Sequence, residues 1–167
     1  MEKTAEYLSK KLSEFFVVTN DPYRGATDFN EKHPLFAGLT EREKKDGKRM
    51  SPLIHRSITE EANKRFGLSS KRIGKSRLQI DLWDEHKKIV YEIVLGNGEE
   101  IWKDVLKAIL VKAKKLVVFC RSYPDETIKG YLAIKNTVSN LEQFLNKRLE
   151  VQVFHIQPKE PKSSWRR

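Results

Sequence analysis

Apolar residues recur along this chain in two patterns, as short continuous runs and at a spacing of three or four residues. Continuous runs bounded by polar or glycine-containing turns predict buried strands. They cover residues 77–83, 89–95, 116–120 and 151–156. The wider spacing predicts helices. It is found over residues 4–18, where the pattern becomes partly extended toward its end, and over 51–66, 99–113 and 128–149.

The order of these segments predicts the fold class. A helix between two apolar strands favours a parallel crossover, here from 89–95 to 116–120. The two runs before it are joined by a short polar turn, as antiparallel neighbours are. We therefore expect an α/β fold with a central mixed β-sheet of about four or five strands, flanked by α-helices. Residues 19–38, 40–50 and 69–76 are predicted to be loops or turns.

Two helices have further signals at the level of single residues. Ser51 as cap, Pro52 at the first helical position and Gly67 as stop predict the limits of the second helix. In the third helix the expected core face and the expected basic ridge lie on opposite sides. The core face comprises Ile101, Trp102, Val105, Leu106, Ile109, Leu110 and Ala113, and the ridge comprises Lys103, Lys107 and Lys114.

Two carboxylates interrupt the apolar strands. Asp81 lies in the middle of the first run and Glu92 in the middle of the second. An unpaired charge inside a buried strand costs several kcal/mol, in order of magnitude, so acids are rare at such positions. Two acids in neighbouring strands point to a shared ligand, such as a divalent cation.

Composition narrows the class of protein. A chain of 167 residues fits one domain, and no apolar run approaches the roughly 20 residues that cross a bilayer. The first ten residues lack the apolar stretch of a signal peptide, and the single cysteine, Cys120, is expected in the core. These features predict a cytoplasmic protein without a membrane partner. The net charge of +10 favours a polyanionic partner, with nucleic acid first.

With an acid in each of two successive strands, followed by helix, strand, helix and strand, residues 51–157 resemble the PD-(D/E)xK nuclease superfamily. That family has the restriction-endonuclease-like fold. The resemblance leaves out residues 1–50, expected to form a helix and a basic loop, and residues 158–167, expected to be a flexible tail. It implies Mg²⁺ or Mn²⁺ held by Asp81, Glu92 and the Ile93 carbonyl, and hydrolysis of DNA.

The chain departs from the family pattern in two places. Ile80 replaces the proline of the motif name, and Val94 replaces the lysine two residues after the acid. Some relatives supply this lysine from the following helix, where Lys103 and Lys107 are candidates. We expect Lys103, which is closer to the glycine turn, to be the catalytic lysine. Glu60 or Glu61 would add an auxiliary carboxylate, with Glu61 as the expected metal ligand.

Basic residues before and after the acid-bearing strands are expected to contact the nucleic-acid backbone. They are Lys71, Arg72, Lys75, Arg77 and Lys107. A homodimer would suit cleavage of two strands. Three alternatives stay open: a catalytically inactive relative that binds nucleic acid, a module that binds a protein partner, and purely structural ion pairs at Asp81 and Glu92.

Overall fold

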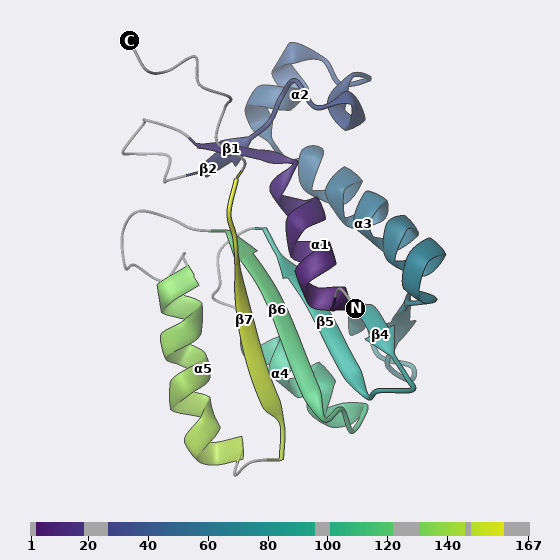
Figure 1. Cartoon of the computed structure of the whole chain (residues 1–167), viewed down its shortest axis with the longest axis vertical. Helices are drawn as coiled ribbons and strands as arrows, with labels where there is room; N and C mark the ends of the chain where they lie inside the picture. Colours follow the sequence, from purple (N-terminus) through teal and green to yellow (C-terminus); the bar gives the residue numbers. More distant parts are fainter. Residues whose placement is uncertain (1–2, 19–26, 96–100, 122–130, 146–147, 159–167) are drawn as a thin grey trace.

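A computed structural model of the chain has one central sheet with helices on both faces (Figure 1). It describes residues 3–18, 27–95, 101–121, 131–145 and 148–158. The sheet has five strands in the order β3-β4-β5-β6-β7. Its first three strands pair antiparallel and its last three pair parallel. The strands are β3 (Ser69–Arg72), β4 (Gln79–Asp84), β5 (Ile89–Val94), β6 (Lys115–Arg121) and β7 (Glu150–Ile156).

The predicted mixed sheet flanked by helices is therefore confirmed. Four of its strands coincide with the four apolar runs, and the crossover from β5 to β6 is parallel as expected. The fifth strand, β3, lies where a basic turn was predicted, so that prediction is wrong. Its sequence is SSKR, and its side chains are exposed or half-buried. An edge strand of this kind has no apolar run from which it can be recognised.

The helices form two layers, one on each face of the sheet. Figure 1 shows α1 and α3 in front of the sheet and α4 behind it. One apolar cluster joins α1 and α3 to the front face, and a second joins α4 and α5 to the back face. The helices are α1 (Thr4–Ser13), α2 (Glu41–Asp46), α3 (Met50–Phe66), α4 (Ile101–Leu110) and α5 (Tyr131–Leu145), with a short 3₁₀ turn, η1 (Pro34–Phe36).

The N-terminal fifty residues contribute to the front layer. Leu8 and Leu12 of α1 and Phe36 of η1 are fully buried in the cluster that also contains Ile58 of α3 and Phe119 of β6. A two-stranded antiparallel pair, β1 (Phe16–Val18) with β2 (Thr27–Phe29), follows α1. The proposed basic tail lies outside the described residues, apart from Pro158.

Helix boundaries follow local signals that the sequence contains. Gly67 ends α3 in the left-handed conformation, at φ 68°, as predicted. The start of α3 was misplaced, because Arg49 rather than Ser51 occupies the N-cap position. Residues 40–50 were predicted to be a turn, yet they include α2. Its capping box joins the Thr40 hydroxyl to the Glu43 N–H and the Glu43 carboxylate to the Thr40 N–H.

The faces of α4 are the clearest correction to the predicted packing. Ile101, Val105 and Ala108 are buried against the sheet, as expected of a core face. Lys107 was expected on an outer basic ridge, but it is buried and points inward. The outer side instead exposes apolar residues that were expected in the core. They are Trp102, Leu106, Ile109 and Leu110.

Candidate active site

A β-bulge in β4 sets the position of Asp81. Lys71 of β3 is opposite Ile80, and Ser69 is opposite Trp83, so two steps along β3 match three steps along β4. Ile80 and Trp83 therefore both face the back cluster, although they are three residues apart. The extra residue lies between them, in the segment that contains Asp81. Bulges of this kind commonly re-aim a side chain beside an active site.

Past the bulge, the Asp81 carboxylate replaces a backbone partner of β5. The β4–β5 pairing runs from Asp84 opposite Ile89 to Leu82 opposite Tyr91. One residue further, the Asp81 Oδ2 atom accepts a hydrogen bond from the Ile93 N–H at 2.8 Å. The other oxygen, Oδ1, lies 3.6 Å from Nδ1 of His55 on α3. The side chain is thus fixed between the sheet and the front layer.

Glu92 faces the back layer, where it meets a buried lysine. It alternates with Tyr91 and Ile93 along β5, which face the front cluster, as the strand pattern predicted. Its Oε1 atom lies 2.8 Å from Nζ of Lys107 on α4. Both side chains are deeply buried, with relative exposures of 3% for the glutamate and 8% for the lysine residue.

The Lys107 ammonium group lies among three oxygen atoms. Besides Glu92, it contacts Asp104 Oδ1 at 2.7 Å and donates a hydrogen bond to the Gln79 carbonyl at 3.1 Å. These partners come from β4, β5 and α4. A buried ammonium is stable only when its protons are satisfied in this way. The contact with Glu92 Oε1 is an ion pair without hydrogen-bond geometry, so this buried oxygen atom has no hydrogen-bond donor among the described residues.

The two strand carboxylates ionise differently. Burial opposes ionisation of Asp81, but His55, the Ile93 N–H and the Lys107 charge outweigh it and lower its pKa below 3.8. Burial, followed by the charges of Asp81 and Asp104, raises the pKa of Glu92 to about 9 despite the ion pair with Lys107. Asp81 approaches α3 on the front layer and Glu92 approaches α4 on the back layer, and the Asp81 charge still contributes to the raised pKa of Glu92. Neighbouring acids with separated pKa values are typical of acid–base sites.

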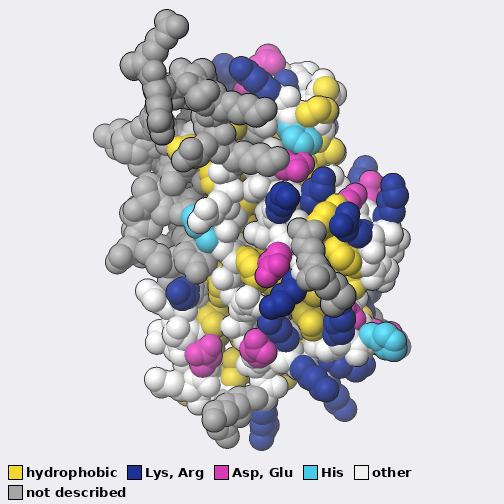
Figure 2. Space-filling view, in the orientation of Figure 1, with side chains coloured by type: hydrophobic (Ala, Val, Ile, Leu, Met, Phe, Trp, Pro, Cys, Tyr) yellow, Lys and Arg dark blue, Asp and Glu magenta, His cyan; other side chains and the backbone are white. Residues whose placement is uncertain are grey.

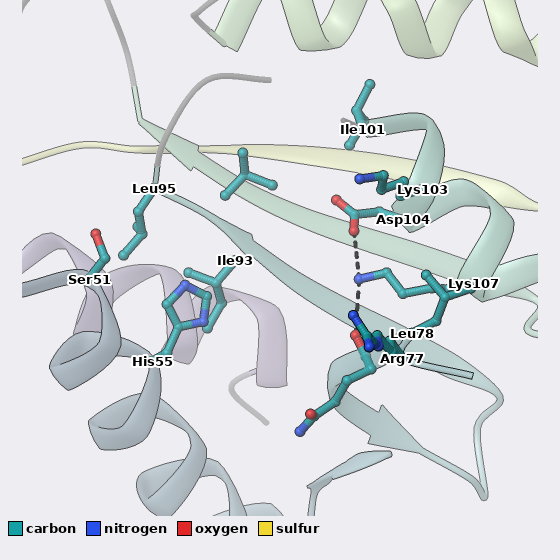
Figure 3. A pocket seen from close by; sticks show the side chains of 12 residues that line it. Ser51, His55, Arg77, Leu78, Ile93, Leu95, Ile101, Lys103, Asp104 and Lys107 are labelled. Atoms are coloured by element: carbon teal, nitrogen blue, oxygen red, sulfur yellow. Dashed lines mark hydrogen bonds and ion pairs between the residues drawn. The ribbon is translucent and has the colours of Figure 1, made fainter. Parts of the chain in front are cut away.

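A cavity of about 470 Å³ opens beside this cluster, between the start of α3 and α4 (Figure 3). Ser51 and His55 line it from α3, and Lys103, Asp104 and Lys107 line it from α4. Arg77, before β4, and Gln79 add to the polar lining, and Ile93 and Leu95 are among the apolar lining residues. Figure 3 shows Lys107 between Asp104 and the start of β4. Several cationic side chains around one cavity favour an anionic ligand.

Lys103 and Glu61, two further predicted site residues, both contact aromatic side chains. Lys103, expected as the catalytic lysine, lines the cavity, but its Nζ lies 5.7 Å from the Trp102 ring centre. The contact to Glu92 is made by Lys107, which was expected at the nucleic-acid surface. Glu61, expected as a metal ligand, accepts a hydrogen bond from the Tyr7 hydroxyl. It lies six positions beyond His55, about 9 Å along the axis of α3.

The basic residues predicted to contact nucleic acid surround the same end of β4. Arg72, Lys75 and Arg77 are exposed, and the Lys71 Nζ lies 5.4 Å from the ring centre of Trp83. Figure 2 shows Lys and Arg side chains along the right-hand side of the molecule, where α3 and β4 lie in Figure 1. Arg77 is both exposed and part of the cavity lining.

His55 and Asp104 are the site residues that were not predicted. Asp104 precedes Lys107 by three residues, a spacing at which helix side chains meet, so this pair was visible in the sequence. His55 carries no such signal. It is separated from Asp81 in the sequence by about three turns of α3, by β3 and by the start of β4, and only the packing of α3 on the sheet brings the two together.

Asp81 and Glu92 bring hard oxygen donors, the ligand type that magnesium and manganese ions prefer. Mg²⁺ binds hard oxygen ligands and commonly uses only one or two carboxylates, with water completing its octahedron. Asp81 and Glu92 offer such carboxylates, and both lie at the point where the regular β4–β5 pairing ends. Within the described ranges, no group of three or more His, Cys, Asp and Glu residues is arranged to hold a metal ion.

Comparison with known protein families, with curated proteins and with solved structures found no significant match to this chain. Among the helices in the described part of the chain, none is both long and apolar enough to cross a membrane.

Proposed function

We propose that this chain is a divalent-metal-dependent nuclease that hydrolyses phosphodiester bonds in DNA, with a restriction-endonuclease-like core. Asp81 and Glu92 would hold Mg²⁺ or Mn²⁺, with the Ile93 carbonyl as a further ligand. Lys107 would take the place of the motif lysine that Val94 replaces. This assignment moves the lysine one helical turn along α4 from Lys103.

One observation carries the proposal: a buried lysine from the helix after β5 reaches the strand acid. The Lys107 Nζ lies 2.8 Å from Glu92, and Asp104 holds it from the other side at 2.7 Å. Burial of a cation between two acids costs desolvation energy, and three apolar side chains in place of Glu92, Asp104 and Lys107 would avoid this cost. Such an arrangement is typical of a site whose residues serve chemistry rather than stability.

Each part of the site has a role in phosphodiester hydrolysis. A bound Mg²⁺ or Mn²⁺ supplies charge neutralisation on the phosphate and lowers the pKa of water. Burial lowers the pKa of Lys107, but Glu92 and Asp104 together raise it above the ordinary value, and Asp104, 2.7 Å away, pairs with the ammonium group while Glu92 holds its proton. The ammonium charge would stabilise the negative charge that develops on the phosphate oxygens. His55 would position Asp81, which it contacts on the side away from the sheet.

The surroundings of the site favour a nucleic-acid substrate. Arg77 and Lys103 line the cavity, and Arg72 and Lys75 are exposed on the approach to it. Phosphate contacts by such side chains give affinity that falls as salt rises. The net charge of +10 would add long-range attraction for any nucleic acid.

A second candidate is a nuclease-fold protein that binds nucleic acid without cleaving it. Its support is the ion pair itself, since Lys107 already engages the Glu92 oxygen that a metal ion would use. In that case the lysine would serve as a permanent internal cation, and binding would need no metal.

The test is cleavage of linear, circular and branched DNA with Mg²⁺ or Mn²⁺, alongside Asp81→Asn, Glu92→Gln and Lys107→Met. Lys103→Met is the matched control, because it removes an ammonium from the same helix and the same cavity. We expect Asp81→Asn and Lys107→Met to reduce the rate by about 100-fold or more, and Lys103→Met to change it by less than about tenfold.

Two further measurements separate the candidates. Titration of the protein with Mn²⁺ without DNA should show binding that Asp81→Asn weakens. DNA affinity should fall with salt and should fall further in Arg77→Ala. Salt-sensitive DNA binding with no cleavage and no Mn²⁺ binding would establish the second candidate. Cleavage that persists in Asp81→Asn would contradict the nuclease assignment of this site.

A further inference from the structure

The cavity opens where strands β4 and β5 separate. Their regular backbone pairing stops short of Asp81, whose carboxylate accepts a hydrogen bond from the Ile93 N–H instead. Leu78 lines the cavity from just before β4, and Val94 lines it from the end of β5. Both side chains are half-buried, so part of their apolar surface stays accessible. The cavity therefore has apolar walls beside its charged ones.

The two sides of the cavity differ in chemistry. Figure 3 shows Arg77, Lys103, Asp104 and Lys107 on one side and Ser51, His55, Ile93 and Leu95 on the other. On the first side Asp104 pairs with Lys107 at 2.7 Å, which leaves an excess of positive charge. The second side brings a hydroxyl group, an imidazole ring and two aliphatic side chains. A ligand with an anionic part and a flat, apolar part would match both sides.

A nucleotide is divided in the same way, into an anionic phosphate and a flat base. Proteins that recognise unpaired bases stack them on aromatic side chains, histidine included. The Ser51 hydroxyl can donate a hydrogen bond to the edge of a base or accept one from it. The cavity volume of about 470 Å³ falls within the roughly 300–1,000 Å³ of pockets that hold molecules of this size. We propose that this cavity binds one unpaired nucleotide of a DNA strand, with its phosphate at Arg77 and Lys103 and its base against the His55 ring.

The apolar walls distinguish a nucleotide from a simple anion. Contact with Leu78 and Val94 would remove water from an inorganic phosphate without replacing its hydrogen bonds, which is unfavourable. A base gains from the same contact, because it buries apolar surface. Val94 also stands where the family motif has a lysine. A lysine at the end of β5 would bring a further charge to this wall, so its replacement by valine favours the base.

A paired base does not suit this arrangement. Inside a duplex each base is stacked and paired, and it reaches a cavity only after it is flipped out, at a cost in unstacking and unpairing. The inference rests on the proposed function for the use of the site, since a nucleotide held here would lie beside Lys107, which lines the same cavity. The substrates would be single strands, strand ends and branch points. Binding itself needs no metal ion, so it can be measured without cleavage.

The first test is isothermal titration calorimetry of the full chain with deoxyadenosine monophosphate in EDTA, compared with deoxyadenosine and inorganic phosphate. The nucleotide should bind at least about tenfold more tightly than either, because its two parts share one loss of translational freedom. Arg77→Ala should weaken binding of both the nucleotide and phosphate by about tenfold. Lys75→Ala is the matched control, because Lys75 is an exposed cation two residues away and is not among the lining residues of the cavity. It should leave both affinities unchanged.

The second test concerns the base. His55→Gln removes the ring and keeps a polar group beside Asp81. It should weaken binding of the nucleotide by at least about fivefold, as loss of base stacking does, and leave phosphate binding unchanged. His55→Phe keeps a flat ring and should retain the affinity for the nucleotide. Circular dichroism would verify that each variant is folded.

The third test separates a DNA strand from a free nucleotide. Fluorescence anisotropy in EDTA would compare a labelled single-stranded oligonucleotide with a blunt hairpin duplex of the same sequence at one salt concentration. The single strand should bind at least about fivefold more tightly, because the duplex must first release a base from its stack. His55→Gln should reduce this preference.

Several results would overturn the proposal. One is no binding of deoxyadenosine monophosphate at millimolar concentration, and another is phosphate binding as tight as that of the nucleotide. Equal affinity for the single strand and the duplex would contradict an unpaired nucleotide. A single strand that binds no more tightly than the mononucleotide would show that the occupant is a free nucleotide. DNA that binds as expected but is never cleaved would contradict the nuclease assignment and leave the nucleotide site standing.

Discussion

Replacing Glu92 by glutamine should stabilise the fold at neutral pH, although it removes one half of an ion pair. Burial and two neighbouring acids raise the pKa of Glu92 to about 9, from an ordinary value of 4.5. Between these two values the folded chain holds a proton that the unfolded chain releases. The free energy of unfolding therefore falls as pH rises from 4.5 and levels off above 9. Glutamine has no proton to release and should abolish this dependence.

The size of the effect follows from the same two pKa values. Each pH unit between them is worth about 1.4 kcal/mol. At pH 7, about 2.5 units above 4.5, the wild-type chain should be less stable than Glu92→Gln by about 3 kcal/mol. At pH 4.5 the two should be nearly equal. In the variant Lys107 still contacts the Asp104 carboxylate and the Gln79 carbonyl, so its charge stays paired.

The assay is urea unfolding at several pH values from 4.5 to 9, with EDTA present so that no divalent ion contributes. Glu150→Gln is the matched control, because Glu150 is paired with Lys115 at the surface and is 68% exposed at its side chain. It should change stability by less than about 1 kcal/mol. If Glu92→Gln is less stable than wild type at pH 7, an ionised Glu92 must be favourably paired with Lys107, and the reasoning is refuted.

Three further predictions concern Asp81, the front core cluster and the end of α3. His55→Gln should raise the pKa of Asp81, because the neighbouring His55 lowers that pKa. NMR of the Asp81 carboxyl carbon would measure the pKa, and an unchanged value would contradict the contact. Phe119→Ala, in a fully buried position of β6, should lower the free energy of unfolding by about 3–5 kcal/mol in the same urea assay. Gly67→Ala should cost about 1 kcal/mol because of its positive φ, whereas Gly38→Ala, with open space around it, should be nearly neutral.

The strands of the sheet could be predicted because their signal lies in consecutive residues. Central strands are covered on both faces and read as continuous apolar runs, as β5 and β6 do. The sequence also predicted that the strand with Asp81 lies beside the strand with Glu92, because only a short turn joins the two strands. β3 could not be predicted, because an edge strand of serines and basic residues is held by its backbone pairing to β4.

The orientation of α4 could not be predicted from periodicity. The helix has apolar residues on two sides, and spacing alone does not say which side meets the sheet. Burial of a lysine is unfavourable unless oxygen atoms contact its ammonium group. For Lys107 these oxygen atoms belong to β4 and β5 as well as to its own helix. The sequence favoured Lys103 over Lys107 only because Lys103 is closer to the glycine turn. Only the three-dimensional placement of Glu92 distinguishes them.

The hydrogen bond from the Ile93 N–H to Asp81 makes this amide a native spectroscopic reporter. An amide proton that points at a carboxylate is sensitive to the charge on that carboxylate, whereas its neighbours in β5 point at backbone carbonyls. The chemical shift of the Ile93 amide proton should change when Asp81 is protonated, and should also change when a cation binds the same carboxylate oxygen. Binding of a cation at Asp81 could thus be followed through one backbone amide proton, without a substrate and without turnover.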